Sequence, residues 1–80
     1  MEQQLRDNLF ACARAFAGAK GLELSTVGRL AAGDGNFFER LNDGKSFTAR
    51  KYDLVIIWFG DNWPEGVVWP EAVERPRRAA

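Results

Sequence analysis

The 80-residue chain contains no histidine and a single cysteine, and its charges cancel, since 11 basic residues oppose 11 acidic ones. Without histidine, and with Cys12 alone, the usual zinc ligands and any disulfide within the chain are missing. Cys12 also lacks the imidazole that would activate a catalytic thiol, so we expect it to be a small buried residue. With no nucleophile–base pair, and too few residues for a deep pocket, the chain is not expected to be an enzyme, and no cofactor or metal is predicted.

Long apolar runs are missing as well. No stretch approaches the length that crosses a membrane, and acidic residues begin at Glu2, which is not the pattern of a secretory signal. The glycine-rich segment GDGNFF lacks the lysine and the hydroxyl residue of a phosphate-binding P-loop. We therefore expect a cytoplasmic protein with neither a membrane partner nor a nucleotide site.

Apolar side chains are nevertheless plentiful, because hydrophobic residues make up 46% of the chain and aromatic ones 12%. This composition is typical of one small globular domain. The helical spacing of the apolar residues predicts an all-α bundle of about four helices, over residues 3–19, 24–32, 35–43 and 48–59. The bundle would occupy residues 1–60, and the Trp/Pro-rich segment 61–80 would form an irregular tail that packs on it or on a partner.

The second predicted helix is short and carries a glycine within it. Val27, Leu30 and Ala31 have the spacing of a buried face, and Gly28 would let a neighbouring segment approach closely. Gly33 follows the last apolar residue, as glycine does at helix C-termini. The segment therefore predicts a helix that stops abruptly and feeds a tight turn.

The third predicted helix follows this turn. Asp34 lies at its expected N-cap position, where a carboxylate accepts hydrogen bonds from unpaired backbone N–H groups. Phe38 and Leu41 are three residues apart and are predicted to face the core, with Phe37 beside them and Gly44 ending the helix. Three polar residues would project away from this face: Asn36, Glu39 and Arg40.

A fourth helix is predicted from Thr48, an N-cap residue, to Phe59. Its segment LVIIWF is also rich in residues that favour β-structure, so a strand stays open as an alternative. Leu54, Ile57 and Trp58 lie outside the expected inward stripe, and a helix that is apolar on more than one side needs a second cover. The inward stripe consists of Tyr52, Val55, Ile56 and Phe59.

The tail offers that cover through two Trp-Pro pairs. Proline favours extended chain over helix, so we expect Trp63 and Trp69 to pack from an irregular segment onto Trp58 and Ile57. A contact with a partner or with a second copy of the chain is the alternative for these tryptophans.

Charge is distributed unevenly along the chain despite its zero sum. From residue 53 to residue 74 every charged residue is acidic, whereas residues 25–52 hold five basic residues against three acidic ones. A mildly basic centre suits a polyanionic partner, and an ordinary mixed-charge surface is the alternative. The basic residues of the centre are Arg29, Arg40, Lys45, Arg50 and Lys51.

Residues 5–59 resemble a helix-turn-helix protein of the phage-repressor, Cro or Xre class. The segment LAAGDGNFFERLNDGKSFTARKYDLVIIWF, followed by NWP, is also similar to small prophage-associated or regulatory proteins of bacteria described only as DNA-binding. The chain departs from the class pattern at the exposed start of the recognition helix, where Gly35 and Asn36 replace the usual glutamine, serine or arginine. The apolar, small and glycine positions that are typical of the class are occupied here by Val27, Gly28, Gly33, Phe38, Leu41 and Gly44.

The resemblance implies a DNA-binding transcriptional regulator whose recognition helix enters the major groove of double-stranded DNA. It makes Asn36, Glu39 and Arg40 candidates for contacts with base edges. Basic residues would contact phosphates, which position the protein without specifying sequence. These phosphate candidates are Arg29, Lys45, Arg50 and Lys51.

One domain of this size would bind DNA weakly alone, so the resemblance also implies a homodimer on two half-sites. The alternative function is a protein-interaction module that uses the same fold to dock on RNA polymerase, another regulator or a phage protein. Candidates for the partner or dimer contact are Leu54, Ile57, Trp58, Trp63 and Trp69.

Overall fold

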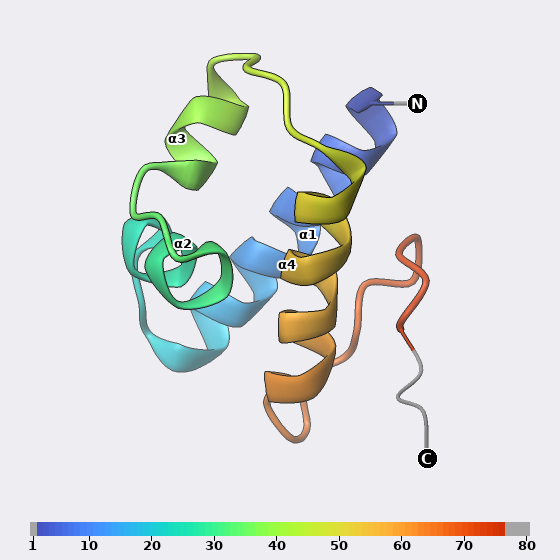
Figure 1. Ribbon diagram of the computed structural model, residues 1–80. Helices are drawn as coiled ribbons and strands as arrows, with labels where there is room; N and C mark the ends of the chain where they lie inside the picture. Colours follow the sequence, from blue (N-terminus) through green and yellow to red (C-terminus); the bar gives the residue numbers. More distant parts are fainter. Residues whose placement is uncertain (1, 77–80) are drawn as a thin grey trace.

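The computed structural model describes residues 2–76, so Met1 and residues 77–80 of the predicted tail lie outside the described residues (Figure 1). Within them the chain forms four helices and no strand, which confirms the all-α bundle and makes the alternative of a strand in LVIIWF wrong. The helices are α1 (Glu2–Lys20), α2 (Leu24–Ala32), α3 (Phe37–Asn42) and α4 (Ala49–Asn62).

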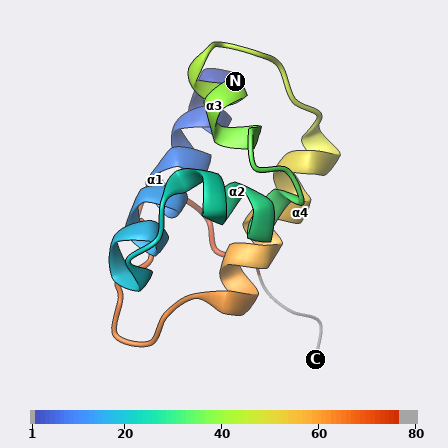
Figure 2. The same ribbon diagram turned by 90° about the vertical axis from the view of Figure 1, so that its left-hand side faces the viewer.

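Three of the helices form the body of the domain. α1, α2 and α4 pack against one another, and α3 packs on α2. Figure 2 shows α2 lying across α1 and α4, with α3 above it. The core that they enclose consists of Leu9, Cys12, Ala13, Phe16, Ala17, Val27, Phe37, Phe38, Leu41, Val55, Ile56, Phe59 and Val73.

Local sequence explains both ends of α4. The Thr48 hydroxyl accepts a hydrogen bond from the backbone N–H of Lys51 at 3.0 Å, which confirms the predicted cap. The helix continues past the predicted end at Phe59, and the Asn62 side chain donates to the Trp58 carbonyl at 2.9 Å in the last turn. Trp63 then adopts an extended backbone, as a residue before proline prefers.

The joint between α2 and α3 depends on two glycines. Gly33 ends α2 in the left-handed region, with φ at 70°, where a side chain would be strained. Gly28 lies in α2 directly under the turn, so a Cβ on Gly28 would come within 2.8 Å of the Asp34 carbonyl oxygen. The predicted close approach at Gly28 is therefore present, and the contact is made by backbone.

α3 is shorter than the predicted helix over 35–43. The Asp34 carboxylate accepts from the Asn36 backbone N–H at 2.9 Å, and the Asp34 carbonyl accepts from the Phe37 N–H at 3.1 Å. These bonds close a turn before the helix, so the N-cap residue of α3 is Asn36. The prediction of Asp34 as the helix cap is wrong, because Asp34 caps the preceding turn instead.

One core prediction in α2 is also wrong. Val27 is fully buried, but Leu30 is 48% exposed. The face of α2 that meets the other helices is set by Val27 and Gly28, and Leu30 lies on the flank of that face, about 60° around the helix from Val27.

The tail packs on the domain from the side opposite α2 and α3 (Figure 1). The Trp63 ring lies 6.3 Å from both the Phe16 and Phe59 rings and 4.7 Å from Trp69, measured between ring centroids. Val73 is 3% exposed, so the tail adds to the core. Trp63 thus contacts Phe16 and Phe59 of the core, and Trp69 packs on Trp63, whereas Ile57, which the two tryptophans were expected to cover, is 45% exposed.

The tail repeats one small motif, WPEGV at residues 63–67 and WPEAV at residues 69–73. In each copy the indole N–H donates to the carbonyl of the valine four residues on, at 2.8 Å for Trp63 and 2.7 Å for Trp69. The N–H of that valine donates in turn to the proline carbonyl. Both part-buried indole nitrogens thus find an acceptor within their own turn, in a segment that forms neither helix nor strand.

Candidate nucleic-acid interface

α3 has one buried and one exposed face, as the sequence predicts. Phe37, Phe38 and Leu41 are 4%, 2% and 2% exposed and fix the helix against the core. The three predicted base-contact residues, Asn36, Glu39 and Arg40, lie on the solvent side. The helix therefore presents a short polar face on a rigid apolar base.

Arg40 is already engaged within the protein. Its guanidinium forms an ion pair with the Asp34 carboxylate across the turn. This hydrogen bond, together with the one from the Asn36 N–H, holds the pKa of the Asp34 carboxyl below its usual value. A contact between Arg40 and a base edge would therefore require the guanidinium to be shared with Asp34 or released from it.

A hollow of about 270 Å³ separates α3 from the start of α4. Its lining includes three of the predicted DNA-contact residues, Arg40, Lys45 and Lys51, together with Asp34. Three cations against one carboxylate give this hollow an excess of positive charge, and its dimensions suit a small anionic group such as a phosphate.

Lys51 has a structural role that the sequence reasoning missed. Its ammonium group donates to the Ala32 carbonyl at 2.6 Å and lies 5.9 Å from the centre of the Phe37 ring. Ala32 is the last residue of α2. At a helix C-terminus, a cation donates a hydrogen bond to an unpaired carbonyl and interacts favourably with the helix dipole. Lys51 thus links α4 to the joint between α2 and α3. One signal for this role was present in the sequence, because a cation is unfavourable in the first turn of a helix and Lys51 lies in the first turn of α4.

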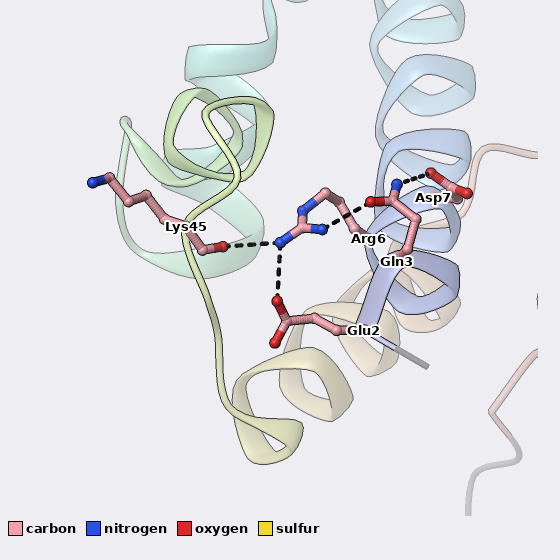
Figure 3. A network of polar contacts seen from close by, with 5 residues as sticks. All are labelled: Glu2, Gln3, Arg6, Asp7 and Lys45. Atoms are coloured by element: carbon pink, nitrogen blue, oxygen red, sulfur yellow. Dashed lines mark hydrogen bonds and ion pairs between the residues drawn. The ribbon is translucent and has the colours of Figure 1, made fainter.

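Arg6 of α1 holds the backbone of Lys45 through a hydrogen bond (Figure 3). The Arg6 guanidinium donates to the Lys45 carbonyl at 3.2 Å and to the Glu2 carboxylate at 3.1 Å, and Gln3 also accepts from it. In Figure 3 the Lys45 ammonium points away from this network. The loop after α3 is therefore anchored while its cation stays exposed to a partner. Arg6 was not among the predicted site residues.

A second groove, of about 400 Å³, lies on the other side of α3. Glu39 lines it from α3 and Asn36 from the N-cap position before that helix, while Ser25 lines it from α2 and Arg14 from α1. Arg14 lies with its guanidinium 5.0 Å from the centre of the Phe10 ring. The sequence reasoning missed Arg14 because its place beside α3 depends on how α1 packs against α2.

The remaining predicted residues lie apart from these two hollows. Arg29 is exposed near the end of α2, and Arg50 is exposed on α4. Of the partner candidates, Leu54 and Ile57 are 54% and 45% exposed. The other three, Trp58, Trp63 and Trp69, are partly buried against the core.

Elsewhere in the fold, Cys12 is fully buried, as predicted. Burial raises the pKa of its thiol to about 12. No helix within residues 2–76 is long and apolar enough to span a membrane. Comparison of the chain with protein-family models, with curated proteins and with solved structures finds no match.

Proposed function

We propose that the protein is a DNA-binding transcriptional regulator that places α3 in the major groove as the second helix of a helix-turn-helix. The observation that carries the proposal is the joint at Gly28 and Asp34, where the backbone of the turn rests directly on α2. This contact fixes α3 rigidly against α2 while its polar face stays exposed. A rigid, exposed short helix is what groove reading requires.

The exposed face of α3 offers suitable chemistry for base recognition. An asparagine such as Asn36 can pair with adenine through two hydrogen bonds, and Glu39 can accept from the amino group of cytosine. Arg40 is suited to guanine when it leaves Asp34. Lys45 and the cationic hollow beside it would contact the phosphate backbone, with Arg29 and Arg14 as further cations.

The proposed role requires two copies on DNA, because one domain offers few phosphate contacts. A regulator of this kind acts in the cytoplasm of a bacterial cell, where the DNA lies. Its test is the selection of bound fragments from random duplex DNA by the full-length protein at physiological salt. We expect a short enriched palindrome, and the absence of any enriched sequence would contradict specific DNA recognition.

The ion pair between Arg40 and Asp34 favours a second candidate function. With its one arginine neutralised and Glu39 beside it, the exposed face of α3 carries little positive charge. Such a face suits a protein partner in the transcription machinery. The dependence of affinity on salt separates the two functions, because DNA binding weakens steeply with salt while docking through apolar contacts does not.

A further inference from the structure

The hollow between α3 and α4 is richer in hydrogen-bond donors than in acceptors. Among the described side chains that line it, three are cations, two carry hydroxyl groups and one is a carboxylate. They are, in that order, Arg40, Lys45 and Lys51, Ser46 and Thr48, and Asp34. Such a lining favours an anion that offers several acceptor oxygens.

The contacts within residues 2–76 leave many of these donors without an acceptor. The Arg40 guanidinium meets Asp34 through one of its nitrogens, and the Lys51 ammonium donates to the Ala32 carbonyl at 2.6 Å. Both groups carry further N–H groups. The Lys45 ammonium, which points away from the α1 network in Figure 3, donates to no group of the described chain. Donors from α3, from the loop and from α4 are therefore available around one hollow.

The charges around the hollow suit a doubly charged anion. The Asp34 carboxylate pairs with Arg40 and offsets one of the three cations, so about two positive charges remain. A phosphate monoester carries about −1.5 to −2 charges at pH 7, whereas each phosphodiester of a DNA backbone carries a single negative charge. Thr48 and Lys51 lie at the N-terminal end of α4, where the helix dipole adds to the attraction for an anion.

The size of the hollow, about 270 Å³, restricts the ligand to a small molecule. Pockets that hold drug-sized ligands begin at about 300 Å³. We propose that the hollow between α3 and α4 binds the doubly charged phosphate group of a small phosphate monoester. Arg40 and Lys45 form ion pairs with the phosphate oxygens. The hydroxyl groups of Ser46 and Thr48 donate further hydrogen bonds to them.

This site also gives the proposed function a form of regulation, and in this respect it rests on that function. Arg40 and Lys45 are also the residues that would contact a base edge and the DNA backbone. A phosphate monoester that engages them therefore competes with DNA. Because the coupling is reciprocal, DNA weakens the binding of the monoester by the same factor.

The site is tested without DNA, by titrating the full-length protein with methyl phosphate and following its backbone amide signals by NMR spectroscopy. We expect the signals that shift to cluster at residues 45–51 and around Arg40. Dimethyl phosphate is the matched ligand, because it has the same phosphate core but a single charge. At equal ionic strength it should bind about tenfold more weakly.

Two lysines of equal charge provide a matched pair of variants. Lys45→Ala removes a cation of the hollow and should weaken the binding of methyl phosphate about tenfold. Lys20→Ala removes the exposed last residue of α1, which does not line the hollow, and should leave the affinity unchanged. Asp34→Asn removes the negative charge of the lining and should strengthen binding, a gain that loss of folding cannot produce.

The inference would be overturned by the absence of shifts around the hollow, by equal affinities for the two esters, or by equal effects of the two lysine variants. A protein that binds methyl phosphate in the hollow but enriches no DNA sequence would keep this site and lose the DNA-binding proposal. Enrichment of a DNA sequence without any shift at the hollow would do the reverse. On the enriched DNA, methyl phosphate should raise the dissociation constant at constant ionic strength, and an unchanged constant would contradict the competition.

Discussion

Gly28 sets the distance between α2 and the turn that follows it. Alanine normally stabilises an exposed helix interior by about 1 kcal/mol relative to glycine. At Gly28 the added Cβ would lie 2.8 Å from the Asp34 carbonyl oxygen, which is backbone and cannot swing away. We expect Gly28→Ala to lower the free energy of unfolding, measured by urea denaturation.

Gly18→Ala is the control for this prediction, because Gly18 is also helical but a Cβ added there would have nothing within 4 Å. It should raise the free energy of unfolding by up to about 1 kcal/mol. If both variants were equally stabilised, the close approach between α2 and the turn would not be a constraint on the fold.

Asp34 links stability to pH. Arg40 and the Asn36 N–H hold its folded-state pKa below the usual value of about 3.9, so the folded state is favoured wherever the carboxyl is ionised. This contribution is present above about pH 4 and is lost as the pH falls through the lowered pKa. Asp34→Asn keeps an acceptor for Asn36 but loses the ion pair with Arg40.

We therefore expect the parent to melt at a higher temperature than Asp34→Asn at pH 7, with the difference closing in acid. Thermal denaturation followed by circular dichroism at several pH values checks this. A gap in melting temperature that stays the same from neutral to acid pH would show that the ion pair does not account for it.

Cys12 links stability to pH at the alkaline end. Burial raises the pKa of its thiol from 9.0 to about 12 in the folded state. Between these values the unfolded chain loses the proton and the folded protein keeps it, so stability should fall as the pH rises. Cys12→Ala lacks this loss, and urea denaturation of both proteins from about pH 7 to pH 10 should show it. Parallel pH dependences would contradict a protonated, buried thiol.

At the scale of the element, mutations on the two faces of α3 should have different effects on stability. Phe38 is 2% exposed, so Phe38→Ala should cost about 3–5 kcal/mol of stability through the cavity that it leaves. Arg40→Ala removes only an exposed ion pair, which is worth about 0–1 kcal/mol. Melting curves of the two variants separate the buried from the exposed face.

Binding isotherms at several salt concentrations then test the proposed roles on DNA. Arg40→Ala should cost about 1–3 kcal/mol on the preferred site and relax the choice of one base. Lys45→Ala should weaken binding to all sequences alike and reduce the salt slope by about one unit. Should both variants bind DNA like the parent, α3 does not read a groove, and the protein-interaction module becomes the better proposal.

At the scale of the whole molecule, the tail is part of the domain. Trp69 packs edge-on against Trp63 and covers the core from outside the helices. Trp69→Ala should lower the free energy of unfolding by about 3 kcal/mol, whereas Val68→Ala, at an 85% exposed position, should change it by about 0.5 kcal/mol or less. Equal stability of the two variants would show that the tail only rests on the surface.

The sequence alone determined which segments form helices, where α2 ends and where α4 begins. The Thr48 cap, the glycine after α2 and the spacing of Phe38 and Leu41 are signals that act within a few residues. The orientation of the polar face of α3 follows from the same periodicity, so the sequence alone predicts that Asn36, Glu39 and Arg40 are exposed. Leu30 shows the limit of this reasoning. In a short helix, the sequence does not determine which residues at the edge of the apolar face are buried, because this depends on the segment that packs against it.

Only the tertiary structure decided which partners these side chains find. Lys51 meets the Ala32 carbonyl and Arg6 meets that of Lys45 through bonds that span 19 and 39 residues. No pattern within a few residues encodes such bonds, because they exist only after α1, α2 and α4 have packed. The same packing put Trp63 of the tail over Phe16 and left Leu54 and Ile57 of α4 about half exposed, since the tail can cover only one side of α4.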